Sequence, residues 1–119
     1  MMAVIKERKL FQCAVSLNGV SSVPHLVDYL SNRRFSLLST PRIKGNLSQR
    51  TLERRSPLYL VKSVKRPIML LHSTNDINVP FEHSQYMAEA LKRVRKDFEF
   101  IVIPGAEHQL KQPKFRKIY

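Results

Sequence analysis

Two residues in the second half of the chain have the types and spacing that acid–base chemistry requires. Asp76 and His108 are 32 residues apart, and each lies in the loop expected after an apolar stretch, 68–72 or 98–103. A carboxylate beside an imidazole holds the imidazole in one tautomer and stabilises the imidazolium, while the imidazole takes a proton from a nucleophile. The pair predicts the acid and base of a catalytic triad. Asp76 taken alone would equally suit a loop residue that closes an Asx-turn.

A parallel sheet and its connecting helices must bring this pair together. Apolar runs predict strands near 13–17, 68–72 and 98–103, the first of them as a buried strand. A helix is expected after the capping sequence Ser21-Ser22-Val23-Pro24, with an apolar stripe that would pack on the sheet, and another over 82–96. The stripe residues are Val23, Leu26, Val27 and Leu30 in the first helix and Met87, Ala90, Leu91 and Val94 in the second.

The stretch between these helices is weakly patterned, with a short helix over 46–54 as its best-defined part. Strands that alternate with helices indicate an α/β fold with right-handed crossovers. In such sheets, ligand chemistry lies at the carboxyl ends of the strands. Asp76 and His108 are both expected at that edge.

The residues around the pair resemble a known family. The string RPIMLLHSTNDINVP at 66–80 is similar to the P-x-L-L-I-H-G-x-x-D-x-x-V-P passage of prolyl oligopeptidase-type serine peptidases, and PGAEH at 104–108 continues the similarity. Upstream, 10–21 resembles the strand after the family's nucleophile helix, and Ser56-Pro57 resembles its Ser-Pro turn.

This resemblance implies that Asp76 is the triad acid and His108 the triad base. It also implies one partial catalytic domain over residues 1–119, the C-terminal portion of an α/β-hydrolase fold with its N-terminal strands absent. Its C-terminal helix would be missing or vestigial, since only 109–119 follow His108. In the intact family the strand near 13–17 would pair with the nucleophile strand, so we expect that edge of the sheet to be open here. Two residues depart from the family's pattern, because Ser73 and Gln109 stand where the family has glycine.

The nucleophile is missing from this pattern. A nucleophile elbow needs Gly-x-Ser-x-Gly, because its serine lies on a strained strand-to-helix turn. The glycines are Gly19, Gly45 and Gly105, and no two of them bracket a serine at that spacing. Ser21 lies between a strand and a helix, but it matches a non-catalytic turn. By resemblance the elbow, and the oxyanion hole that it helps to form, should precede Met1, so we expect the chain to be inactive alone.

The other residues capable of chemistry have structural interpretations. His72 is expected to be a strand-end packing residue, and His25 and His83 to have surface or structural roles. Cys13 lies in an apolar run and is expected to be a buried, inert thiol. As the only cysteine it can form neither an internal disulfide nor a thiolate zinc site. We expect no metal and no cofactor.

Composition limits the remaining function classes. The chain has 119 residues, 43% of them hydrophobic, and no apolar run near the ~18 residues of a membrane span. The N-terminal residues carry charge where a signal peptide is apolar, so the cytoplasm is the expected location. There are 21 Lys and Arg residues against 9 Asp and Glu, a net charge of +12. The cations are scattered and lack interleaved aromatics, which favours a solvated basic surface over a nucleic-acid site.

Three functions therefore stay open. The first is serine-type peptidase or esterase chemistry on a peptide or ester substrate, with the nucleophile supplied by sequence absent from this chain. The second is a non-catalytic remnant or a partner-binding fragment that keeps the residues of the fold without its activity. The third is a basic nucleic-acid-binding module, whose affinity would fall steeply with salt.

Overall fold

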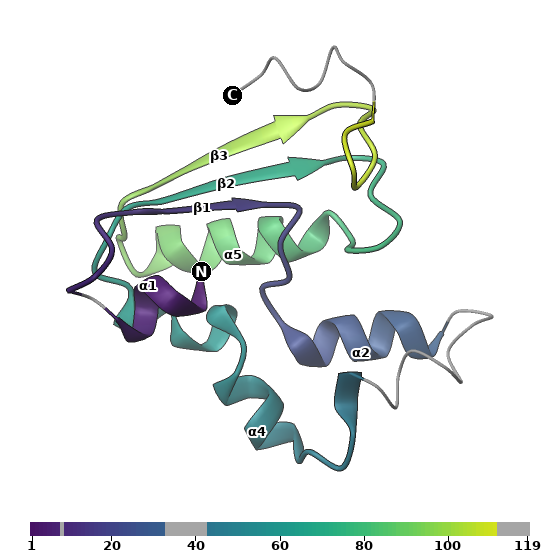
Figure 1. Cartoon of the computed structure of the whole chain (residues 1–119), viewed down its shortest axis with the longest axis horizontal. Helices are drawn as coiled ribbons and strands as arrows, with labels where there is room; N and C mark the ends of the chain where they lie inside the picture. Colours follow the sequence, from purple (N-terminus) through teal and green to yellow (C-terminus); the bar gives the residue numbers. More distant parts are fainter. Residues whose placement is uncertain (8, 33–42, 112–119) are drawn as a thin grey trace.

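Three parallel strands form the centre of the molecule. The computed structural model describes residues 1–7, 9–32 and 43–111. The strands are β1 (Ala14–Leu17), β2 (Ile68–Ser73) and β3 (Phe98–Ile103). They pair in the order β1-β2-β3, with Leu17 opposite Leu71 and Ser73 opposite Ile103. The carboxyl ends of all three strands therefore lie at one edge of the sheet, as the sequence predicted (Figure 1).

Helices connect the strands on one face of the sheet and beyond it. They are α1 (Met2–Lys6), α2 (Val23–Ser31), α4 (Gln49–Arg54), the 3-10 helix η1 (Pro57–Ser63) and α5 (Glu82–Arg93). Helices α1 and α5 lie on the same side of the sheet, whereas α2 and α4 extend away from it (Figure 1). The order strand, helix, strand, helix, strand confirms the predicted α/β architecture with crossover helices.

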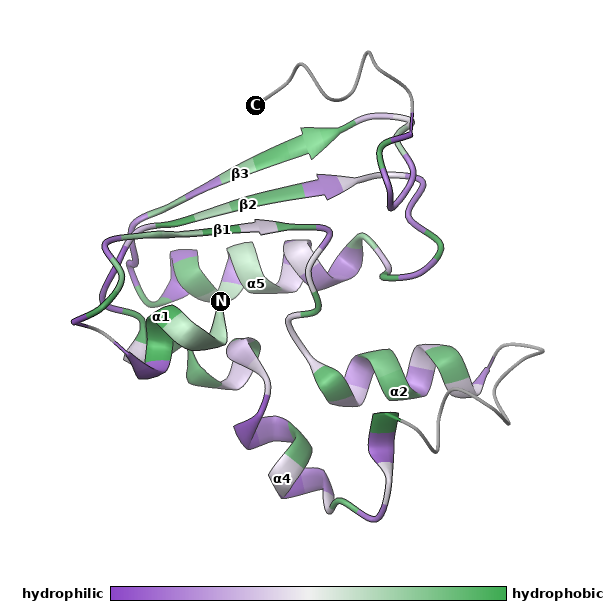
Figure 2. Cartoon of the chain, in the orientation of Figure 1, coloured by the Kyte–Doolittle hydropathy of each residue, from purple (hydrophilic) through white to green (hydrophobic). Residues whose placement is uncertain are grey.

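The main core fills the space between the sheet and α5. Ile68 and Leu70 point from β2 toward Met87 and Leu91 of α5, and all four side chains are buried. A smaller cluster of Leu71, Ile103, Ala106 and Leu110 covers part of the opposite face of the sheet. The strands β2 and β3 are apolar along most of their length, whereas α5 alternates apolar and polar residues (Figure 2). This amphipathic pattern is why α5 was predictable.

Helix α2 begins where its sequence predicts but packs differently. The Ser22 hydroxyl accepts a hydrogen bond from the His25 N–H at 3.3 Å, and Pro24 occupies the first turn. The expectation that the apolar stripe packs on the sheet is wrong, because α2 extends away from the sheet and packs mainly on α4 (Figure 1). Periodicity shows that a helix has an apolar face, but it does not identify the element that covers that face.

Two burial predictions in the first strand region are also wrong. Strand β1 was expected to be buried, yet Val15 is 64% and Leu17 42% exposed. Cys13, expected to be a buried thiol, is exposed. Among the described residues β1 pairs only with β2, so its second edge has no neighbouring strand there. Of the segment 109–119, where we expected the family's last helix to be missing or vestigial, 112–119 lie outside the described residues.

Candidate active site

Asp76 and His108 lie in direct contact at the carboxyl edge of the sheet. His108 Nδ1 is 2.6 Å from Asp76 Oδ2, and such a short contact indicates a strong hydrogen bond to the charged carboxylate. Since a carboxylate oxygen accepts, Nδ1 carries the proton and donates it. The Asp76 side chain is fully buried, whereas the His108 side chain is 34% exposed. The sequence predicted this juxtaposition from the order of strands and loops.

Backbone hydrogen bonds hold the Asp76 carboxylate in place. Its Oδ1 accepts from the N–H groups of Asn78 and Val79, each at 2.9 Å. This local turn is the Asx-type role that the sequence offered as an alternative for Asp76. The two roles are compatible, because one oxygen closes the turn and the other contacts His108. The turn therefore fixes the direction in which Oδ2 points.

The loops that carry the pair are bonded to each other. Thr74 N–H donates to Ile103 O at 3.1 Å and Asn75 N–H donates to Ala106 O at 3.0 Å. In return, Gly105 N–H donates to the Thr74 hydroxyl at 2.8 Å. Gly105 has a φ of 70°, a backbone conformation that favours glycine. These bonds extend the pairing of β2 and β3 past the ends of the strands.

His72 lies behind the pair as a neutral, buried support. Its Nε2 is 3.0 Å from Val79 O and therefore donates to it, which leaves Nδ1 to accept from the Ser84 hydroxyl at 2.6 Å. Desolvation by burial lowers the pKa of His72, although the Val79 carbonyl and Asp76 act in the opposite direction. The His72 ring is fully buried, and its Nε2 is 3.6 Å from Asp76 Oδ2. The structure agrees with the packing role predicted for His72.

His83 is also buried and supports the loop that follows β1. Its Nδ1 accepts from the N–H groups of Ser21 and Ser22, each at 3.4 Å. Burial, helped by the nearby His25 and His72, lowers the pKa of His83 from 6.5 to about 4. Of the two roles that the sequence allowed for His83, the structural one fits its 2% exposure.

Ser21 is unsuited to nucleophilic attack. It is fully buried, and its hydroxyl donates to the backbone carbonyl of His83 at 2.7 Å. This hydroxyl is therefore occupied in a structural bond and has no access to solvent. The sequence had given Ser21 a non-catalytic turn role, and the geometry agrees.

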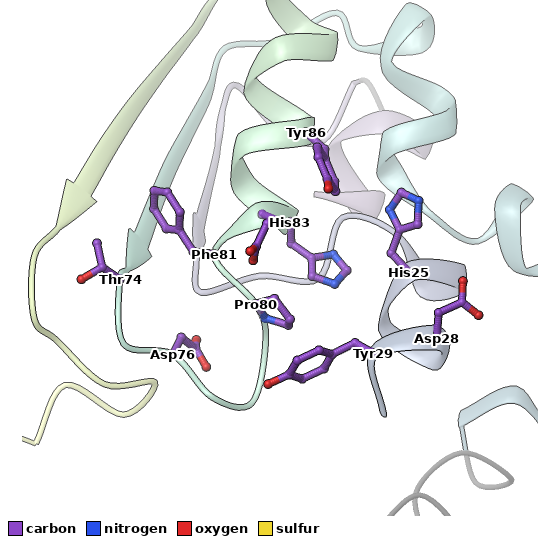
Figure 3. A pocket seen from close by; sticks show the side chains of 10 residues that line it. His25, Asp28, Tyr29, Thr74, Asp76, Pro80, Phe81, His83 and Tyr86 are labelled. Carbon is purple, nitrogen blue, oxygen red and sulfur yellow. The ribbon is translucent and has the colours of Figure 1, made fainter. Parts of the chain in front are cut away.

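Two open hollows flank the Asp76–His108 pair. The larger, of about 660 Å³, lies between α2, the loop after β2 and the start of α5. Asp76, Tyr29 and His83 are among its lining residues, and Figure 3 shows the side chains around it. The second, of about 520 Å³, is lined by His108, Gln109 and the loop around Asn78. Reactants could therefore approach the pair from solvent.

Sequence reasoning missed one residue at this edge. Asn18 follows β1, and its Nδ2 donates to the backbone carbonyl of His108 at 2.8 Å. The Asn18-Gly19 dipeptide was interpreted as a turn after the strand. No short-range pattern connects a side chain to a partner 90 residues away.

Neither a membrane span nor a metal cluster is found in the part of the chain that the structure describes. None of the helices there has both the length and the apolar character that crossing a bilayer requires. No group of three or more histidine, cysteine or carboxylate side chains in the described ranges is arranged to hold a metal ion.

Known proteins are similar to this chain in sequence and in fold. The model of the prolyl oligopeptidase family matches residues 1–119. YuxL, an uncharacterized peptidase of Bacillus subtilis, is 34% identical over 56 residues, which cover 47% of this chain and 8% of that protein. Dipeptidyl peptidase family member 6 of Caenorhabditis elegans is 26% identical over 110 residues, which cover 87% of this chain and 15% of that protein.

A solved structure shows the same fold. A Mycobacterium tuberculosis puromycin-hydrolyzing peptidase superposes with a TM-score of 0.80 at 23% identity, over 96% of this chain and 17% of that one. The parallel strands and crossover helices thus form part of the α/β-hydrolase fold, as the sequence predicted. The chain spans only 8% to 17% of the length of these three proteins.

Proposed function

The chain belongs to the prolyl oligopeptidase family, and from that premise we propose that Asp76 and His108 are the acid and base of a serine-peptidase triad. The 2.6 Å hydrogen bond from His108 Nδ1 to Asp76 Oδ2 carries this proposal. It fixes the tautomer in which Nε2 has a free lone pair. That nitrogen is the one that a catalytic imidazole uses to take the proton of a nucleophile.

The chemistry that this pair supports is acyl transfer. As a serine oxygen attacks the acyl carbon of a peptide or ester, its proton passes to His108 Nε2, and buried Asp76 stabilises the resulting imidazolium. The imidazolium then protonates the leaving amine or alcohol as the acyl–nitrogen or acyl–oxygen bond breaks. Water, activated in the same way, releases the acyl group from the serine.

The serine itself belongs to sequence outside these residues. No Gly-x-Ser-x-Gly occurs in the chain, and the hydroxyl of buried Ser21 donates its hydrogen bond to the His83 carbonyl. Among the described residues β1 leaves one edge of the sheet unpaired, with Val15 and Leu17 exposed there. We propose that the strand leading to the nucleophile pairs with this edge, and that the complete domain acts in the cytoplasm on a peptide or ester.

A chimera tests this function. The matched region of the Mycobacterium tuberculosis peptidase is replaced by residues 1–119, and hydrolysis of aminoacyl anilides and p-nitrophenyl esters is compared with that of the parent enzyme. We expect hydrolysis by the chimera and its loss in His108→Ala. A chimera that elutes and melts like the parent but hydrolyses no acyl substrate would contradict the proposal.

The chain alone provides a complementary control. A fluorophosphonate probe labels activated serines, and the burial of Ser21 predicts no labelling of the purified chain. Labelling that disappears in Ser21→Ala would assign the nucleophile to Ser21 and overturn the arrangement proposed here.

A further inference from the structure

Asn18 links the ends of all three strands through its side-chain amide. Its Oδ1 accepts from the Ser73 N–H at 2.7 Å. Its Nδ2 donates to the Ser73 hydroxyl at 3.0 Å and to the His108 carbonyl at 2.8 Å. The residue is 4% exposed, so three bonds made by one buried carboxamide join β1 to the end of β2 and to the loop after β3.

The backbone of Asn18 is shaped for this contact. Its φ is 47°, in the left-handed region that few residues other than glycine, asparagine and aspartate adopt readily. Its N–H still donates to Leu71 O at 2.9 Å, so the sheet ladder continues up to this residue. The chain then turns, and the side chain reaches across the strand ends instead of following the ladder.

The bond to the His108 carbonyl is distinct from the others that hold this loop. The bonds from Thr74, Asn75 and Gly105 fix the loop after β3 only as far as Ala106. The Asn18 bond acts on residue 108 itself, two positions farther along the chain. Fixing a residue's own carbonyl limits rotation about its backbone, and thereby the direction of its side chain.

We propose that Asn18 is a positioning residue that orients His108 so that Nδ1 faces Asp76. This inference rests on the proposed function for its catalytic meaning, but the positioning itself is a property of the chain. Misplacing a catalytic group by about 1 Å can cost on the order of 100-fold in rate. A single 2.8 Å bond at His108 can therefore influence catalysis without contacting substrate.

The Ser73 hydroxyl makes an additional hydrogen bond with the Asn18 side chain. The resemblance noted above places glycine at this position, and a glycine would offer only its backbone N–H to Asn18. Here the Ser73 hydroxyl also accepts from Asn18 Nδ2. Ser73 is fully buried, so the amide and the hydroxyl satisfy each other away from water. Serine in place of the family's glycine therefore adds one hydrogen bond that holds the Asn18 side chain in position.

Nitrogen-15 NMR of the full chain tests the positioning directly. Long-range ¹H–¹⁵N spectra of neutral histidine distinguish the Nδ1–H from the Nε2–H tautomer. We expect native His108 to hold its proton on Nδ1. In Asn18→Gly, which keeps a positive φ without strain, and in Asn18→Asp, which puts a carboxylate opposite the His108 carbonyl, we expect the Nδ1–H signal to be lost or averaged between tautomers.

Ser56→Ala is the matched control for general destabilisation. Ser56 is also fully buried, and its hydroxyl links Val23 N–H to Leu52 O, at 2.8 and 2.7 Å. This variant removes comparable bonds away from His108, so its Nδ1–H signal should match the native one. The proposal would be overturned if the His108 Nδ1–H signal were unchanged in both Asn18 variants. It would also be overturned if Ser56→Ala lost this signal to the same extent as the Asn18 variants.

The unmodified chain gives a further result if the variants do not fold. The two Nδ2 protons of Asn18 should exchange slowly with solvent, and one should show a through-hydrogen-bond coupling to the His108 carbonyl carbon. Fast exchange of both protons would overturn the proposal.

The chimera separates this inference from the proposed function. We expect Asn18→Gly to lower kcat there by about 10- to 100-fold with little change in KM. An inactive parent chimera, together with the expected NMR result, would refute the triad and leave the positioning of His108 in place. An active chimera whose kcat is insensitive to Asn18→Gly would refute the positioning and leave the triad.

Discussion

Replacing Asp76 with asparagine should reverse the tautomer of His108. The native carboxylate offers one oxygen to the N–H groups of Asn78 and Val79, at 2.9 Å each, and the other to His108 Nδ1, at 2.6 Å. An asparagine has only one oxygen. Two backbone N–H donors face the place of Oδ1, whereas only His108 Nδ1 faces the place of Oδ2. The asparagine oxygen therefore stays with the backbone N–H groups, and its amide nitrogen faces His108. Nδ1 must then accept, and the imidazole proton moves to Nε2.

The cost to stability should be moderate. A hydrogen bond to a charged group contributes about 1.5–3 kcal/mol and a neutral one about 0.5–1.5 kcal/mol. The two backbone bonds persist but each weakens by about 1 kcal/mol, while the contact with His108 is inverted instead of lost. We therefore expect the free energy of unfolding to fall by about 2 kcal/mol, which lowers the urea midpoint by about 1–2 M.

Two measurements on the Asp76→Asn chain test this reasoning. Urea unfolding gives the change in stability, and long-range ¹H–¹⁵N spectra give the position of the His108 proton. In the chimera, a triad whose imidazole is in the wrong tautomer should lose about 10⁴-fold in kcat. A His108 proton that stays on Nδ1 in a folded Asp76→Asn chain would refute this prediction, because it would show that the carboxylate does not set the tautomer.

Three further predictions concern the fold. Because the pKa of His83 falls from 6.5 to about 4 on folding, the unfolded chain binds more protons between these values, so stability is complete above about pH 7 and is lost as the pH falls. In urea unfolding, the His83 share of this loss should be about 2 kcal/mol between about pH 7 and pH 5. His83→Gln should remove that share and leave the share of His72, whose pKa burial also lowers, and an equally steep loss in that variant would assign it to other groups. Leu91 is fully buried against the sheet, so Leu91→Ala should cost about 2–5 kcal/mol in the same assay, and a cost below about 1 kcal/mol would argue against this core. Val15 is 64% exposed on β1, whose second edge pairs with no strand among the described residues. Val15→Lys should therefore reduce self-association in light scattering while leaving the urea midpoint unchanged, whereas a lowered midpoint would show that Val15 is packed.

The parts of the fold that the sequence predicted are those set by local pattern. The apolar runs at 68–72 and 98–103 became β2 and β3, and the stripe through Met87 and Leu91 became the buried face of α5. The sequence also predicted that these two strands are neighbours, and β2 and β3 do pair. The loops after neighbouring parallel strands lie side by side, so the contact between Asp76 and His108 could be predicted.

The parts that the sequence did not predict depend on distant partners. The open edge beside 13–17 was expected from the resemblance, but an apolar run does not show whether its faces are covered. The exposure of the Val15 and Cys13 side chains was therefore missed. The packing of α2 on α4 and the burial of His83 against Ser21 likewise depend on neighbours far along the chain. Asn18 is the clearest case, because its hydrogen-bond partners are 55 and 90 residues away. From the local sequence, Asn18-Gly19 was interpreted only as a turn after the strand.

The rate of fluorophosphonate labelling of the chimera tests the central claim most directly, because it reports the activation of the serine by His108 without depending on a choice of substrate. A general base contributes about 10²–10⁴-fold to such a reaction. If the Asp76–His108 pair is the acid and base of the triad, the native chimera should be labelled at least about 100-fold faster than its His108→Ala variant. Equal labelling rates in the two folded proteins would contradict it.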